Sequence, residues 1–123
     1  MKIFKNKINF FLILIVCFLS CKNETKFNPN TWNIKNDIGQ YTFRKDMIND
    51  IIENDLVKGK SVEELEKMFG PLQVGALNNQ SMIIQNIEKD FASDIDPVGS
   101  TDFIIYLDNE GKVINSEIKS YQK

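Results

Sequence analysis

The sequence predicts an α+β domain in which two N-terminal helices pack on a small antiparallel sheet of about three strands. Apolar residues recur at helical spacing between residues 44 and 58, and a second stripe of this kind follows from residue 61. Near the C-terminus, FIIYLDNEGKVINSEIKSY holds two runs rich in β-branched and aromatic residues around the turn DNEG. Two amphipathic helices followed by an antiparallel hairpin are typical of the α+β class.

The first twenty residues have the pattern of a secretory signal peptide. Three lysines within the first seven residues precede an apolar run at 10–19, which is too short to span a bilayer. The small residue Ser20 comes next, directly before Cys21. This arrangement resembles a bacterial lipoprotein signal of the Bacteroidetes type, in which the cysteine after the cut is acylated. We therefore expect cleavage after Ser20 and a lipid on Cys21 that anchors the chain to a membrane.

The two cysteines allow three other interpretations. A disulfide between Cys17 and Cys21 would close a tiny loop inside the apolar segment, and a metal site would lack ligands because the chain has no His and no further Cys. A secreted protein without lipid would carry a free thiol in an oxidising compartment. The lipid explains Cys21 best. Lys22 after it, in place of Asp, favours the outer membrane, facing the periplasm.

These features divide the chain into three parts. We expect a signal peptide over 1–20, a lipidated N-terminus with tether and arm over 21–43, and an α+β interaction domain over 44–123. Cleavage removes three lysines and no acidic residue, so the formal net charge falls from −2 to −5. This charge argues against a nucleic-acid partner. The absence of His removes Ser–His–Asp and Cys–His nucleophiles, so we expect no enzyme, no cofactor and no metal.

The arm contains Trp32, Ile34, Ile38, Tyr41 and Phe43, spaced for neither a clean strand nor a clean helix. We expect it to pack against the domain. Its aromatic residues Trp32, Tyr41 and Phe43 are also one candidate interaction surface, and the outer face of the sheet is the other.

The first helix is predicted from Met47, Ile48, Ile51, Ile52 and Leu56. Asp46 is its expected N-cap and Gly59 its expected left-handed end.

The second helix opens with Ser61 and Glu64, which form an S-x-x-E capping box. Gly70 and Pro71 end it, because Pro cannot continue a helix.

Residues 72–80 are predicted to be a connection, whereas 82–91 remain ambiguous. The apolar residues of the latter segment fit a helix, but its β-branched run fits a strand of about six residues. In the C-terminal hairpin, Phe103, Ile105 and Leu107 share one face by alternation. Asp108 and Gly111 are the predicted turn residues. We expect no calcium site at Asp94, Asp96 and Asp102, because Pro97 breaks the loop and no Glu follows at the required position.

Two segments together resemble the BamE (SmpA/OmlA) family of small outer-membrane lipoproteins. LVKGKSVEELEKMFGPL is similar to the family's helix segment, and FIIYLDNEGKVINSEI to its late strand. The resemblance covers roughly residues 44–120 and implies a strand at 82–88. It also implies a non-catalytic accessory of outer-membrane assembly. The same helix–helix–sheet fold occurs in secreted β-lactamase-inhibitor proteins. The matching residues are Gly59, Ser61, Glu64, Leu65, Met68, Phe69, Gly70, Leu107, Asp108, Gly111 and Val113.

The leading hypothesis is thus a lipid-anchored, non-catalytic domain that binds an unidentified envelope protein. The alternative is a secreted inhibitor or immunity-type protein that blocks a periplasmic enzyme. A small enzyme or ligand-binding module is the third class, and it would need a concave pocket with converging polar groups.

Overall fold

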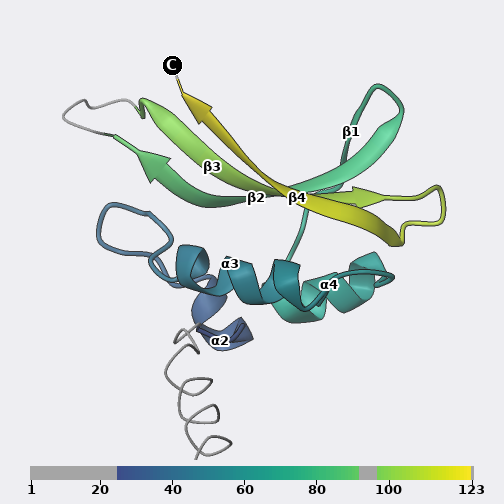
Figure 1. Ribbon diagram of the computed structural model, residues 1–123, viewed down its shortest axis with the longest axis horizontal. Coiled ribbons are helices and arrows are strands. Elements are labelled where there is room, and N and C mark those ends of the chain that lie inside the picture. Colours follow the sequence, from purple (N-terminus) through teal and green to yellow (C-terminus); the bar gives the residue numbers. More distant parts are fainter. Residues whose placement is uncertain (1–24, 92–96, 123) are drawn as a thin grey trace, which may run out of the picture.

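The computed structural model describes residues 25–91 and 97–122, which form an antiparallel sheet with helices packed on one of its faces (Figure 1). The four strands are neighbours in the order β1-β2-β3-β4, so each pairs with the next along the chain. The α+β prediction is confirmed, with four strands in place of about three. The elements are α2 (Pro29–Trp32), α3 (Arg44–Glu53), α4 (Val62–Phe69), β1 (Gly75–Leu77), β2 (Gln80–Asp90), β3 (Gly99–Leu107) and β4 (Val113–Gln122).

The helix α3 is shorter than the sequence predicts. Phe43 is its N-cap and makes no side-chain capping bond, so the prediction of Asp46 as the cap is wrong; Asp46 lies in the first turn. At the other end Asp55 adopts a left-handed φ of 49°. The Leu56 N–H then donates to the Ile51 carbonyl at 3.0 Å, a helix ending of the Schellman type. The predicted end at Gly59 is therefore also wrong.

The helix α4 begins as predicted. The Ser61 hydroxyl accepts from the Glu64 N–H, and the Glu64 carboxylate accepts from the Ser61 N–H, both at 3.3 Å. These two bonds confirm the capping box. The Glu64 carboxylate accepts from both the N–H and the hydroxyl of Ser61, and these bonds lower the pKa of Glu64. Gly70 ends the helix at a φ of 83°, and a Cβ there would lie 3.0 Å from the Asn33 amide nitrogen. Glycine suits this position, because other residues rarely adopt this backbone angle and a Cβ would press on the Asn33 side chain.

The strand β1 lies in the segment that the sequence predicted to be a connection. A two-residue turn joins it to β2, and both turn residues, Asn78 and Asn79, have left-handed φ angles of 51° and 65°. Such a turn matches the twist of paired strands. The ambiguous segment after it is a strand, since β2 runs from Gln80 to Asp90, with a shift in its register to β3 between Asn86 and Glu88.

The hairpin between β3 and β4 has the predicted turn. The Asp108 carboxylate accepts from the backbone N–H groups of Glu110 and Lys112, each at 2.9 Å, and Gly111 supplies the left-handed residue at a φ of 80°. The register shifts beside this turn, between Tyr106 and Leu107. The predicted turn roles of Asp108 and Gly111 are confirmed.

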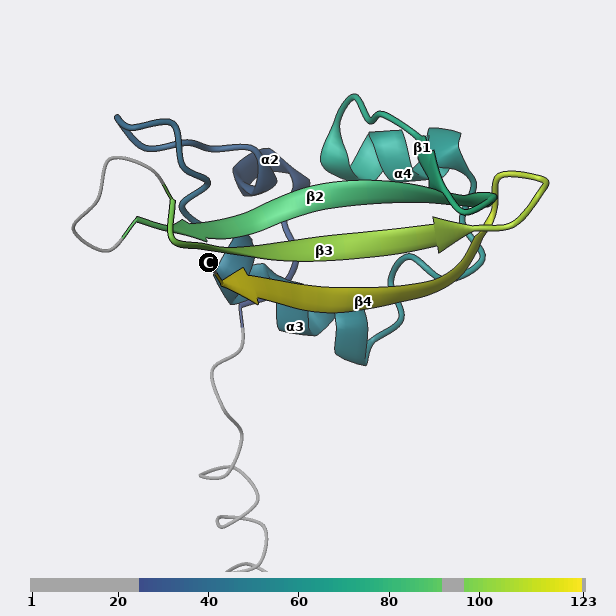
Figure 2. The ribbon, with the colours of Figure 1, turned by 90° about the horizontal axis from the view of Figure 1, so that it is seen from above.

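A single core fills the space between the sheet and the helices. Phe103, Ile105 and Leu107 all point into it, as the alternation predicted. Viewed from above, the three long strands lie side by side and α3 runs beneath them toward β4 (Figure 2). Trp32 from α2 and Phe69 from α4 meet in this core with ring centroids 5.1 Å apart. The opposite face of the sheet carries no helix among the described residues (Figure 1).

Candidate functional site

Trp32, one of the three aromatic residues predicted for an interaction surface, has no exposed area. Its indole N–H donates to the Gln85 side-chain oxygen on β2 at 2.8 Å. The Phe27 ring packs edge-on against it. Trp32 therefore belongs to the core, where it binds the N-terminal residues to the sheet, and it offers nothing to a partner.

Arg44 joins the part of the arm that follows the buried Trp32, residues 33–43, to the rest of the domain; below, the arm means these residues. Only 3% of its surface is exposed. Its guanidinium donates to the carbonyls of Trp32 and Asn86 at 3.0 and 2.8 Å and to the Asn33 side-chain oxygen at 2.7 Å. It also stacks 3.3 Å from the ring centroid of Tyr41. Burial lowers the pKa of Arg44 to about 10, although Tyr41 opposes this, so the side chain stays charged at neutral pH.

The exposed apolar residues of the arm lie at its tip and at its base. Ile38 is 74% exposed, in a turn that the Asn36 side chain holds by accepting from the N–H groups of Ile38 and Gln40. Ile34 and Phe43 are also exposed, whereas Tyr41 is half-buried between Arg44 and the Lys35 ammonium. Of the three predicted aromatic residues, Phe43 alone presents exposed apolar area, and the two isoleucines add to it.

The outer face of the sheet carries an apolar strip. Leu77 and Ile84 are 62% and 56% exposed, and Ile84 stands opposite Ile104 in the register. Ile104 is only 4% exposed, because its neighbours on this face cover it. We call this set of residues the outer strip: Leu77, Met82, Ile84, Ile104 and Tyr106. The sequence predicted the outer face of the sheet as a candidate surface but did not give its residues, because the segment that forms β2 was ambiguous between helix and strand.

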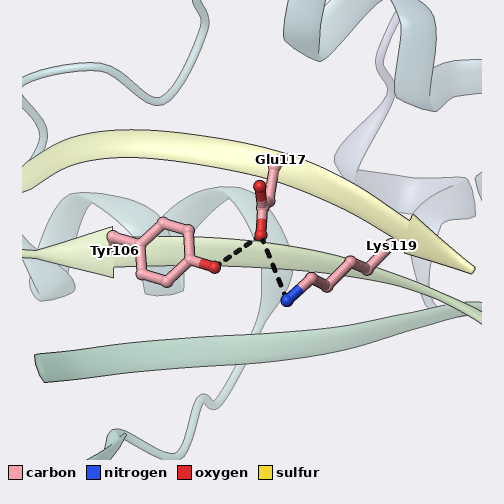
Figure 3. A network of polar contacts seen from close by, with 3 residues as sticks. All are labelled: Tyr106, Glu117 and Lys119. Atoms are coloured by element: carbon pink, nitrogen blue, oxygen red, sulfur yellow. Dashed lines mark hydrogen bonds and ion pairs between the residues drawn. The ribbon is translucent and has the colours of Figure 1, made fainter. Parts of the chain in front are cut away.

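A polar network borders the outer strip on β4 (Figure 3). The Tyr106 hydroxyl donates to a Glu117 carboxylate oxygen at 2.6 Å, and the Lys119 ammonium lies 3.8 Å from the same oxygen. The bond to Glu117 raises the pKa of Tyr106, because it favours the protonated phenol. The strip is thus apolar on β1 and β2, and charged side chains of β4 border it.

Among the open hollows of the described surface, three lie beside strands. Their volumes are about 200, 260 and 250 Å³, below the range of roughly 300–1,000 Å³ usual for small-molecule sites. One of them adjoins the outer strip and is lined by Gln73, Val74, Gly75, Met82 and Ile84. Another lies where β2 ends and β3 begins, beside polar residues of three strands.

Several predicted features lie partly or wholly outside the described residues. Cys21 is one of them, as are Asp94 and Asp96. Asp102, the remaining member of that acidic group, accepts hydrogen bonds from Asn86 and Ser100, each within 3.2 Å. Across residues 25–91 and 97–122, no three His, Cys, Asp or Glu side chains gather where they could hold a metal ion. In the same residues, no helix has both the length and the apolar character needed to cross a membrane.

Comparison of the chain with protein-family models, with curated proteins and with solved structures finds no match. The outer strip and the arm are therefore the candidate binding surfaces of the described residues.

Proposed function

We propose that this chain is a lipid-anchored, non-catalytic protein of the bacterial cell envelope whose domain binds another protein. The signal at residues 1–20 and the cysteine that follows support the anchor. The resemblance of two segments to the BamE family suggests an accessory role in outer-membrane assembly, on the periplasmic side of the outer membrane.

The observation that carries the binding role is the outer strip. Isolated exposed apolar residues are common on soluble proteins. Here, however, Leu77 and Ile84 lie on one continuous face beside Met82 and over Ile104. An apolar centre with the charged pair Glu117–Lys119 at its rim has the layout of a protein interface.

A matched pair of substitutions tests this surface. Ile84→Thr removes an apolar contact from the strip but keeps a β-branched residue, which suits a strand. Ile114→Thr makes the same change at a residue that is 51% exposed on β4, outside the strip. Purification of the native lipoprotein in mild detergent, with partners identified by mass spectrometry, should recover about tenfold less partner with the first variant. The second variant should recover as much as the wild type, and equal loss in both would refute the strip as the interface.

The identity of the partner distinguishes the leading proposal from the inhibitor alternative. A component of the outer-membrane assembly machinery would support the accessory role. If a soluble periplasmic enzyme is recovered instead, the inhibitor alternative is correct. In that case Cys21→Ser should leave inhibition intact while the protein leaves the membrane fraction.

A further inference from the structure

Gly75 is the only glycine of this chain that its own backbone does not require. Its φ lies outside the left-handed region, and a Cβ built on it would lie 4.0 Å from the Met82 carbonyl oxygen, an ordinary contact. A Cβ on Gly99, by contrast, would lie 3.0 Å from the Tyr121 carbonyl oxygen, so the fold needs glycine there. The remaining glycines all have left-handed φ angles, and they are Gly39, Gly59, Gly70 and Gly111.

Glycine is also a poor residue for the place that Gly75 occupies. It begins the strand β1, directly opposite Met82 on β2, and the register of these two strands is regular. Glycine weakens a strand, because it has no side chain to pack and loses the most conformational freedom on folding. A β-branched residue would suit β1 better. Where no bulge or bend explains it, a strand glycine marks a close approach by another molecule.

The absent side chain leaves room on the open face of the sheet. Residues paired across two strands share a face, so Gly75 faces outward with Met82, beside Ile84 of the outer strip. The hollow of about 250 Å³ lies here, with Gln73 and Val74 as its other walls. A larger residue at position 75 would project into this hollow and reduce it. Gly75 therefore keeps open a hollow that adjoins the outer strip.

The walls of this hollow are uncharged and mostly apolar. Val74 and Ile84 are 50% and 56% exposed, and Met82 contributes a thioether. A charged group would lose hydration here without gaining an opposite charge, so the hollow favours an uncharged occupant the size of one large side chain. Thioethers make favourable contacts with aromatic rings. The Gln73 amide can bond to a phenol hydroxyl or to an indole N–H.

We infer that the hollow at Gly75 receives one aromatic side chain of the protein that binds the outer strip. This inference rests on the proposed function and deepens it, because it gives the partner a single anchor residue beside the apolar contacts to Leu77 and Ile84. Aromatic anchors seated in pockets carry much of the binding energy at protein interfaces. The ring of the partner would lie against Met82, in the space that glycine leaves.

Filling the hollow tests its place in the interface. Gly75→Val puts a branched side chain into the hollow, whereas Ala76→Val enlarges the next residue, which is exposed on the other face of β1. When the native lipoprotein is purified in mild detergent, Gly75→Val should recover several-fold less partner and Ala76→Val as much as the wild type. Undiminished recovery with Gly75→Val would overturn the inference.

Thermal unfolding of the same variant tests the premise. The melting temperature of Gly75→Val should equal or exceed that of the wild type, because valine suits a strand better than glycine. A clearly lower melting temperature would overturn the inference as well, since the fold itself would then need the glycine.

A direct titration tests the aromatic occupant without the partner. The lipoprotein, with ¹³C in its methionine methyl groups, is titrated with N-acetyltyrosinamide or N-acetylleucinamide in mild detergent and followed by NMR. Ring currents of the bound tyrosine should shift the Met82 methyl signal to saturation. The signal of Met47, which has no exposed area, should stay unchanged. The leucine amide should give no saturable shift, and neither should the tyrosine amide with Gly75→Val.

The outcomes separate this inference from the proposed function. No saturable shift at Met82, or an equal response to both amides, would refute the aromatic occupant. Loss of partner with Ile84→Thr but not with Gly75→Val would keep the proposed function and refute the hollow as part of its interface. Loss with both variants, together with a saturable shift from the tyrosine amide alone, would support the inference.

Discussion

Two aromatic side chains donate hydrogen bonds on opposite faces of the same sheet. On the inner face the Trp32 indole donates to Gln85 at 2.8 Å, and on the outer face the Tyr106 hydroxyl donates to Glu117 at 2.6 Å. The outer bond is shorter and involves a carboxylate, which strengthens a hydrogen bond in isolation. Yet water can replace either partner on the open face, whereas Trp32 and Gln85 are both buried. The burial of the two partners, more than the length of the hydrogen bond, therefore decides what such a bond contributes to stability.

The largest effect should come from the inner aromatic residue. Trp32→Ala removes the largest side chain of the core, along with its contacts to Phe27 and Phe69. We expect a loss of about 3–5 kcal/mol in the free energy of unfolding, measured by denaturant titration. A loss below about 1 kcal/mol would mean that the N-terminal residues do not pack on the sheet in solution.

Removing only the acceptor on the inner face is a sharper test. Gln85→Leu roughly keeps the volume of the side chain but leaves the buried indole N–H of Trp32 without its acceptor. An unsatisfied buried donor costs about 1–3 kcal/mol, so the unfolding midpoint should fall clearly. A midpoint equal to that of the wild type would show that water enters this part of the core.

Asp50 lies between these two cases. Its carboxylate is accessible to solvent, yet it accepts a hydrogen bond from the backbone N–H of Phe27. The N–H of Phe27 and, to a smaller extent, the Asn54 amide lower the pKa of Asp50 below its ordinary value of 3.8. A carboxyl whose pKa is lower in the folded state stabilises the fold above the unfolded pKa, and this contribution disappears as the pH falls through the folded value. At about pH 7 the wild type should therefore be more stable than Asp50→Asn. The gap should narrow below pH 3.8, and a gap independent of pH would contradict the assignment.

The smallest effect belongs to the outer face. Tyr106→Phe removes the hydroxyl that donates to Glu117 and nothing else. Thermal unfolding should show no measurable change, because both groups can bond to water once they are separated. A clear drop in the melting temperature would mean that the outer hydrogen bond does stabilise the fold. It would also indicate that another molecule covers this face.

The features that the sequence predicted correctly depend on residues close together in the chain. Ser61 and Glu64 cap α4 from three residues apart, and Asp108 bonds to the turn that it begins. The errors have a local cause as well. Asp55 and the pair Asn78–Asn79 adopt left-handed angles that are more typical of glycine. For that reason no glycine marked the early end of α3 or the turn between β1 and β2.

The surfaces were harder to predict because they depend on contacts between distant parts of the chain. Gln85 buries Trp32 from 53 residues away, and Arg44 reaches Asn86 across 42. Nothing in the local pattern around residue 32 distinguishes a buried indole from an exposed one. Likewise, Ile84 belongs to the outer strip only because β2 turns Ile83 toward the helices.

The bond between Trp32 and Gln85 also has a consequence for how folding can be followed. Every strand pairs with its neighbour in sequence, so the sheet can grow one hairpin at a time with short loops to close. Docking of the N-terminal residues instead closes a loop of 53 residues, which costs more entropy. Trp32 is the sole tryptophan of the chain. Its fluorescence therefore reports when the helix layer closes over the sheet, and circular dichroism in the far ultraviolet reports separately when helices and strands form.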